Sequence, residues 1–168
     1  MDTVNEVRPF RAEHYNPEKI ENVGLCLSRT DDAINSAEQD AYYRGIPYNV
    51  VHLILNQNKP ADNETNNRYT RSRDLLAAWR KEQMIVSYRR PSFWVYEQDF
   101  QVEGLPPRHV SGFIGLVRLQ DFESGRILPH ENILREPLEY RIRLIRTTQT
   151  QFDYIWGMYN ANHTFSGF

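Results

Sequence analysis

The chain is short of cysteine, of long apolar runs and of net charge, and each shortage excludes a class of protein. Cys26 is the only cysteine among 168 residues, so no internal disulfide can form, which is typical of a reducing cytoplasm. No apolar run approaches the ~20 residues that a transmembrane helix needs. Residues 1–6 lack the basic and apolar parts of a secretory signal peptide. The sequence therefore predicts a cytoplasmic protein with no membrane partner.

Familiar site patterns are absent as well. The 20 basic and 22 acidic side chains give a formal net charge of −2, so no overall field attracts nucleic acid. The basic stretch from Arg71 to Lys81 is interpreted as a solvated helix face. The five histidines are too scattered for a structural zinc site. The glycine-rich strings of common phosphate-binding, dinucleotide-binding and hydrolase sites do not occur. Cys26 is expected to be a small buried core residue.

What the chain does contain is a succession of short elements. Strands are predicted at 48–55, 93–100, 111–119 and 153–159, and helices at 68–83 and 138–148. The segment 48–55 is apolar on both faces, which favours a central strand. Gly104, Pro106 and Pro107 predict a hairpin between 93–100 and 111–119. The helix at 68–83 places Trp79 on an apolar face, where we expect it to be buried.

The order of these elements predicts the fold class. Residues 17–45 are expected to be loop and short helix ending near Gly45, and 56–67 a flexible polar loop. No internal repeat or composition shift marks a second domain. Strands and helices alternate without a regular βαβ rhythm, which favours an α+β fold. We therefore expect residues 1–168 to form a single domain in which helices pack on one mixed β-sheet.

The most informative chemistry lies immediately before the second predicted helix. His130, Glu131 and Asn132 are adjacent, Arg135 follows them, and Pro137 is suited to the first position of a helix. A helix N-terminus offers free N–H groups and the positive end of a dipole, which favour a bound anion. The loop is therefore a candidate anion site. The alternative is that Glu131 and Asn132 only cap the helix while Arg135 is solvated.

The same region takes part in a family resemblance that extends over most of the chain. The sequence resembles the domain of unknown function 1015 family. The resemblance rests on blocks in the family's order, at residues 7–12, 47–53, Trp79, 91–98, 112–115, 128–131 and Arg141. It implies a relation to the ParB/sulfiredoxin-like superfamily, whose members bind nucleotides and include a free-serine kinase. The implied fold is that of this superfamily.

The resemblance also implies roles for individual residues. Glu131-Asn132-Ile133-Leu134-Arg135 is similar to the Glu-Asn-x-x-Arg motif of ParB nucleotidases. By that likeness Glu131 and His130 would be catalytic, and Arg135 and Asn132 would bind nucleotide or phosphate, with Arg141 in support. Glu131 and Asn132 would also lie near Mg²⁺. The implied function is a small-molecule kinase that uses ATP or ADP with Mg²⁺ and phosphorylates a hydroxyl such as that of serine.

Two departures from the family pattern leave an alternative open. The family's Pro-Pro-Tyr-Asp stretch is replaced at residues 23–28, which contain no aspartate. Its Asp-Gly-His-His-Arg motif would lie beyond the sequence given, so we expect this chain to correspond to the N-terminal part of a family protein and to be inactive by itself. The alternative function is a non-catalytic, nucleotide-gated binding or regulatory module. The sequence does not fix the substrate, the preferred nucleotide or the oligomeric state.

Overall fold

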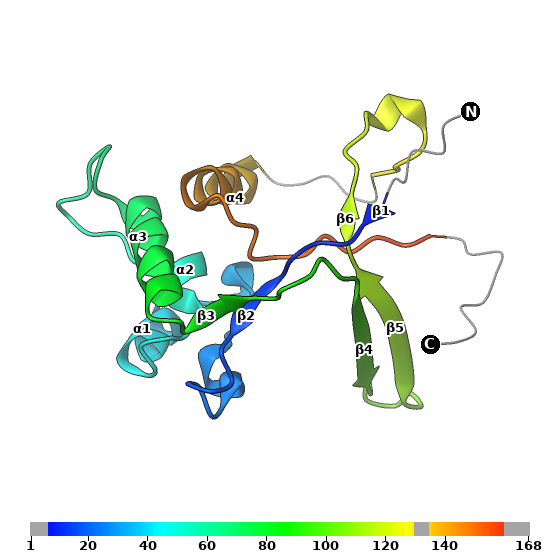
Figure 1. The fold of residues 1–168 in the computed structure, drawn as a ribbon, viewed down its shortest axis with the longest axis horizontal. Helices are drawn as coiled ribbons and strands as arrows, with labels where there is room; N and C mark the ends of the chain where they lie inside the picture. The colour runs from blue at the N-terminus through cyan, green and yellow to red at the C-terminus, as the bar shows by residue number, and fades with distance from the viewer. Residues whose placement is uncertain (1–6, 130–134, 160–168) are drawn as a thin grey trace.

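The computed structural model describes residues 7–129 and 135–159, which contain both helices and short strands (Figure 1). The strands are β1 (Val7–Arg8), β2 (Glu13–Tyr15), β3 (Ile85–Ser87), β4 (Trp94–Phe100), β5 (Arg108–Ile114) and β6 (Leu116–Val117). The helices are α1 (Ser36–Arg44), α2 (Val51–Ile54), α3 (Arg68–Lys81) and α4 (Arg135–Thr148). Three short 3₁₀ turns are η1 (Val23–Cys26), η2 (Asp31–Ala33) and η3 (Phe122–Ser124). The mixed helix and strand content agrees with the predicted class.

The predicted single mixed sheet is wrong for the residues described. The strands there pair as three separate two-stranded antiparallel sheets, β1 with β6, β2 with β3, and β4 with β5. Four of the six strands are only two or three residues long, so they cannot supply a ladder for a larger sheet. The predicted hairpin is present, and its strands pair from Trp94 opposite Ile114 to Phe100 opposite Arg108. It projects away from the helices (Figure 1).

The core lies among the helices. Leu53 and Ile54 of α2 pack with Leu76 and Trp79 of α3, and Trp79 is only 2% exposed. The prediction of a buried Trp79 is therefore confirmed. Asn67 starts α3 with a capping box, because its side chain accepts from the Thr70 N–H while Thr70 bonds back to the Asn67 N–H. Cys26 is also buried, as expected.

The segment 48–55 contains the helical turn α2 and no strand, although a strand was predicted there. An apolar run of this length does not by itself distinguish a buried strand from a buried helical turn. Asn49 decides between them, because its side-chain oxygen accepts from the Val51 N–H at 3.0 Å and starts the turn of α2. The Asn49 amide also donates to the carbonyls of Leu25 and Leu27, which joins α2 to η1. Local hydrogen bonding thus overrides the β-rich composition.

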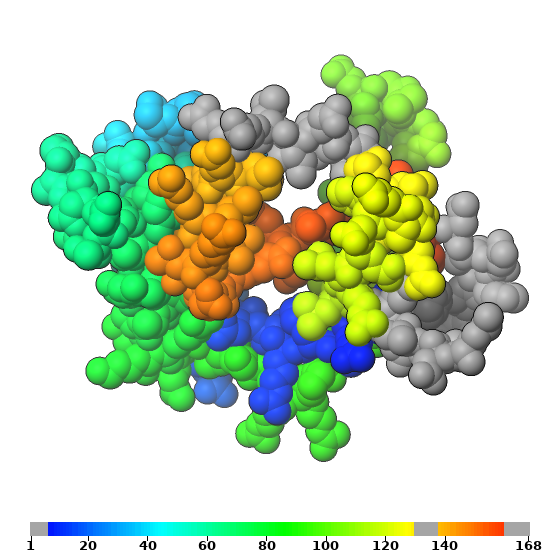
Figure 2. Space-filling model, turned by 90° about the horizontal axis from the view of Figure 1, so that it is seen from above, coloured from blue at the N-terminus to red at the C-terminus, as the bar shows by residue number. Residues whose placement is uncertain are grey.

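The predicted strand at 153–159 is also wrong. After α4 the chain turns at Gln149, whose φ of 53° lies in the left-handed region, and residues 153–159 have no regular secondary structure. In the space-filling view this segment runs between α4 and the part of the chain that holds β6 and η3 (Figure 2). Trp156 makes an edge contact with Tyr96 of the hairpin, with the ring centroids 5.8 Å apart. Aromatic packing therefore replaces a strand ladder there.

Helix α4 is confirmed, but its buried face differs from the apolar stripe that Leu138, Ile142 and Ile145 predict from their i, i+4, i+7 spacing in the sequence. Leu138 and Ile145 of that stripe are exposed, whereas Leu144 and Thr148 are buried. The Thr148 hydroxyl donates to the Leu144 carbonyl at 2.8 Å, which satisfies its buried oxygen. A polar residue whose hydroxyl is hydrogen-bonded within its own helix can therefore face the core. The spacing of the apolar residues alone predicted the wrong buried face for α4.

Candidate functional site

The structure places two of the predicted site residues on α4. Arg135 is the first residue of this helix and Arg141 lies in its second turn. We expected the helix to begin at Pro137, so it begins two residues earlier, and Arg135 belongs to the first turn. His130, Glu131 and Asn132 lie outside the described residues; in sequence they come shortly before α4. Of the predicted motif, the structure therefore places only Arg135 at a helix N-terminus.

Arg141 has a specific acidic partner. Its Nη2 donates to Oδ1 of Asp31 at 3.0 Å, and the Asp31 side chain is only 12% exposed. The hydrogen bond to Asp31 raises the pKa of the Arg141 guanidinium, so it stays charged. Arg141 Nε is buried and has no hydrogen-bond partner. Arg141 thus ties α4 to η2, and a phosphate that bound Arg141 would compete with Asp31.

Two further carboxyls surround this pair. Burial raises the pKa of Asp153, and the negative charge of Asp31 raises it further. The pKa of Asp32 is lowered, mainly by a hydrogen bond with the Thr30 side chain. Within residues 7–129 and 135–159, no three His, Cys, Asp or Glu side chains are grouped so that they could hold a metal ion. Asp31, Asp32 and Asp153 therefore make the surroundings of Arg141 acidic.

Tyr140, adjacent to Arg141, fixes the other side of α4. Its hydroxyl donates to the Ile54 carbonyl of the core, and burial raises its pKa to about 12. The guanidinium of Arg68 lies over the Tyr140 ring, 4.6 Å from the centroid, in a cation–π contact. Arg68 Nε is buried without a hydrogen-bond partner, as is Arg141 Nε. Arg68 and Arg141 therefore each keep an unused donor, and Arg68 uses its guanidinium plane against Tyr140.

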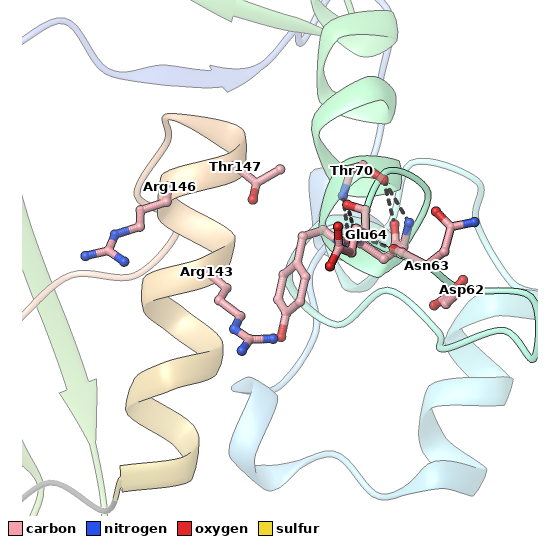
Figure 3. Close-up of a pocket in the computed structure, with 9 residues that line it drawn as sticks. Asp62, Asn63, Glu64, Thr70, Arg143, Arg146 and Thr147 are labelled. Carbon is pink, nitrogen blue, oxygen red and sulfur yellow. Dashed lines mark hydrogen bonds between the residues drawn. The ribbon is translucent and has the colours of Figure 1, made fainter.

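A hollow of about 670 Å³ lies on another side of α4, facing the loop before α3. It is lined by Asp62, Asn63, Glu64, Asn67, Tyr69, Thr70, Arg143, Arg146 and Thr147. Arg143 reaches from α4 toward the loop, whereas the guanidinium of Arg146 points away from it (Figure 3). Asp62 is engaged by Arg71, whose Nη1 lies 2.6 Å from Asp62 Oδ1. The lining comes from polar and charged residues and from Tyr69, and it includes neither Arg135 nor Arg141.

Sequence reasoning missed Asp31 and Arg68, which meet α4 from distant parts of the chain. Asp31 is 110 positions from Arg141, and no local pattern connects them. For Arg68 the sequence did contain a helix-start signal, because this residue follows the capping residue Asn67. That signal does not predict which other helix Arg68 contacts.

These observations define a mixed α/β protein with an arginine-rich helix that is anchored by an aspartate and a tyrosine. Within the described part of the chain, no helix is long and apolar enough to cross a membrane. Residues 7–167 match the family described as "Protein of unknown function (DUF1015)", so the chain belongs to that family. Neither a curated protein nor a solved structure matches the chain.

Proposed function

We propose that the chain is part of a nucleotide-binding small-molecule kinase. In this proposal the phosphate groups of the bound nucleotide lie at the start of α4. The observation that carries the proposal is the position of Arg135 in the first turn of that helix, three residues after Asn132 in the sequence. Backbone N–H groups of a first turn are unpaired and attract phosphate, and an arginine there adds a charge-assisted hydrogen bond. The resemblance to the ParB/sulfiredoxin-like superfamily supports this assignment.

Each residue of the segment then has a chemical role. Glu131 takes the proton of the acceptor hydroxyl, such as that of serine, while His130 and Arg135 stabilise charge on the transferred phosphoryl group. Glu131 and Asn132 offer the oxygen atoms that Mg²⁺ prefers, so they are the residues that would hold it beside ATP or ADP. Bound Mg²⁺ would neutralise phosphate charge. Phosphoryl transfer depends mainly on such positioning.

Two arginines of the described residues keep a donor that an anionic ligand would use. Arg68 and Arg141 each have a buried Nε without a hydrogen-bond partner, and Arg68 lies over the Tyr140 ring. The family's aspartate is absent from residues 23–28, but Asp31 follows shortly after and contacts Arg141. We propose that Asp31 holds Arg141 in place beside the nucleotide, so Asp31 acts as a positioning residue and Arg141 supports phosphate binding.

A non-catalytic nucleotide-gated module is the second candidate. The Asp31 contact favours it, because an arginine already paired with a carboxylate suits a switch that a phosphate opens by competition. In that case nucleotide binding would weaken the contact between α4 and η2. The kinase requires no such change.

The test separates the metal-side role of Glu131 from phosphate binding. Affinity for ATP is measured by calorimetry with and without Mg²⁺, for the native chain and for Glu131→Gln. The kinase proposal expects Mg²⁺ to strengthen binding in the native chain, and expects Glu131→Gln to keep the metal-free affinity while losing most of the Mg²⁺ effect. An unchanged Mg²⁺ effect in Glu131→Gln contradicts the assigned role.

A further inference from the structure

The hollow between α4 and the loop before α3 is separate from the phosphate site proposed at the start of α4. Neither Arg135 nor Arg141 is among the residues that line it. Arg143, which does line it, comes eight residues after Arg135, about 12 Å along the helix axis. Its volume of about 670 Å³ falls within the roughly 300–1,000 Å³ usual for small-molecule pockets. The hollow is therefore far enough away and large enough to hold a ligand of its own.

The loop side of the hollow carries one unpaired negative charge. Both carboxylate oxygens of Asp62 are bonded to Arg71, at 2.6 Å from Nη1 to Oδ1 and at 3.0 Å from Nη2 to Oδ2. Glu64 lies on the same loop and is exposed. Its side chain makes no hydrogen bond or ion pair within residues 7–129 and 135–159. The Glu64 carboxylate can therefore bind a positively charged group.

The α4 side of the hollow carries one unpaired positive charge. Arg143 extends from α4 toward the loop, whereas the guanidinium of Arg146 points away from it (Figure 3). Arg143 is exposed and has no hydrogen-bond or ion-pair partner in the part of the chain that the structure describes. Although Arg143 and Glu64 line the same hollow, no ion pair joins them. A ligand that contacts both therefore needs a positive group at one end and a negative group at the other.

The two charges disfavour ligands of a single sign. A nucleotide phosphate in the hollow would be attracted by Arg143 and repelled by Glu64, and a simple cation would meet the reverse. A molecule with an ammonium group and a carboxylate makes a charge-assisted hydrogen bond at each end. The lining hydroxyls of Tyr69 and Thr147 make no hydrogen bond with another described residue, and a hydroxyl can both donate and accept. They suit the N–H and C=O groups of a peptide bond.

We propose that the hollow binds short peptides with free ends, of about two or three residues for a pocket of this size. The ammonium group of the peptide contacts Glu64, its carboxylate contacts Arg143, and its amide groups lie near Tyr69 and Thr147. A single free amino acid has no peptide bond to offer these hydroxyls. The inference is independent of the proposed kinase function, because neither Glu64 nor Arg143 belongs to the proposed phosphate site.

Calorimetry with trialanine, N-acetyl-trialanine, trialanine amide and free alanine tests the proposal on the native chain. Trialanine should bind saturably, and free alanine should bind more weakly. Blocking either end should weaken binding about tenfold, because it removes one charge-assisted contact at an exposed position. The proposal is overturned if trialanine does not bind, if alanine binds as tightly as trialanine, or if both blocked peptides bind as tightly as the free one.

Two variants assign the ends of the peptide. Glu64→Gln should lose the preference for a free ammonium group and keep that for a free carboxylate, whereas Arg143→Gln should do the reverse. Glu103→Gln and Arg44→Gln, at exposed positions outside the lining, are the charge-matched controls and should bind like the native chain. Circular dichroism confirms that each variant keeps its fold. If Glu64→Gln and Arg143→Gln both retain the two preferences, the proposal is wrong.

Discussion

Arg141 of α4 donates a 3.0 Å hydrogen bond to Asp31 of η2, although 110 residues separate them. This contact joins the 3₁₀ turn η2 to helix α4. It holds one side of α4, while Tyr140 and its cation–π partner Arg68 hold the other. The helix that begins at the predicted phosphate motif is therefore held at fixed points.

The Arg141–Asp31 contact should be measurable as a coupling energy. Arg141→Gln and Asp31→Asn, alone and combined, are compared by urea unfolding in a double-mutant cycle. Because the Arg141 side chain is 42% exposed, solvent screens the pair, and we expect a coupling of about 1 kcal/mol. The same cycle between Arg143 and Asp31 serves as a control and should give no coupling. Equal values in both cycles would show that the contact is not specific.

Trp79 should contribute more to stability than any residue of the hairpin. It is 2% exposed and packs with Leu53, Ile54 and Leu76, so Trp79→Ala should lower the unfolding free energy by ~3–5 kcal/mol. Val95, which is 64% exposed on β4, offers the control, since Val95→Ala should have a small effect. Chemical denaturation measures both. A small loss for Trp79→Ala would contradict a core centred on α2 and α3.

Stability should fall in strong alkali because of a buried tyrosine. Burial raises the pKa of Tyr140 from 10.0 to about 12, so the folded state keeps its proton where the unfolded state has lost it. The contribution is complete below pH 10 and is lost as pH rises from 10 to 12. Tyr140→Phe should flatten part of this fall; Tyr15, whose pKa burial also raises, accounts for another part. Unfolding free energies at several alkaline pH values provide the check.

The parts of the fold that could be predicted are those where periodicity and caps agree. Helix α3 has an apolar face and the capping residue Asn67, and the hairpin has Gly104 and two prolines between its strands. The strand predicted at 48–55 is wrong because the side-chain hydrogen bonds of Asn49 outweigh the β propensity of the apolar residues. The strand predicted at 153–159 is wrong because this segment packs through aromatic contacts such as that of Trp156 with Tyr96. Such contacts join distant parts of the chain, so a local pattern does not predict them.

The candidate site, too, contains features that the sequence predicted and features that it did not. The start of a helix near Arg135 could be predicted, since Pro137 and the amphipathic stretch after it are local signals. The partner of Arg141 could not, because a contact across 110 residues leaves no local trace. The positions of His130, Glu131 and Asn132 lie outside the described residues, so their roles stay predictions.

The most direct test of the account is an ATP titration of the native chain and of Arg135→Ala, with Mg²⁺ present, followed by calorimetry. Arg146→Ala, at the other end of the same helix, is the matched control for loss of one positive charge. We predict saturable binding that Arg135→Ala weakens about ten- to hundredfold, because a charge-assisted hydrogen bond is worth roughly 1.5–3 kcal/mol. Arg146→Ala should bind like the native chain. No binding by the native chain, or equal affinity in Arg135→Ala, would contradict a phosphate site at the start of α4.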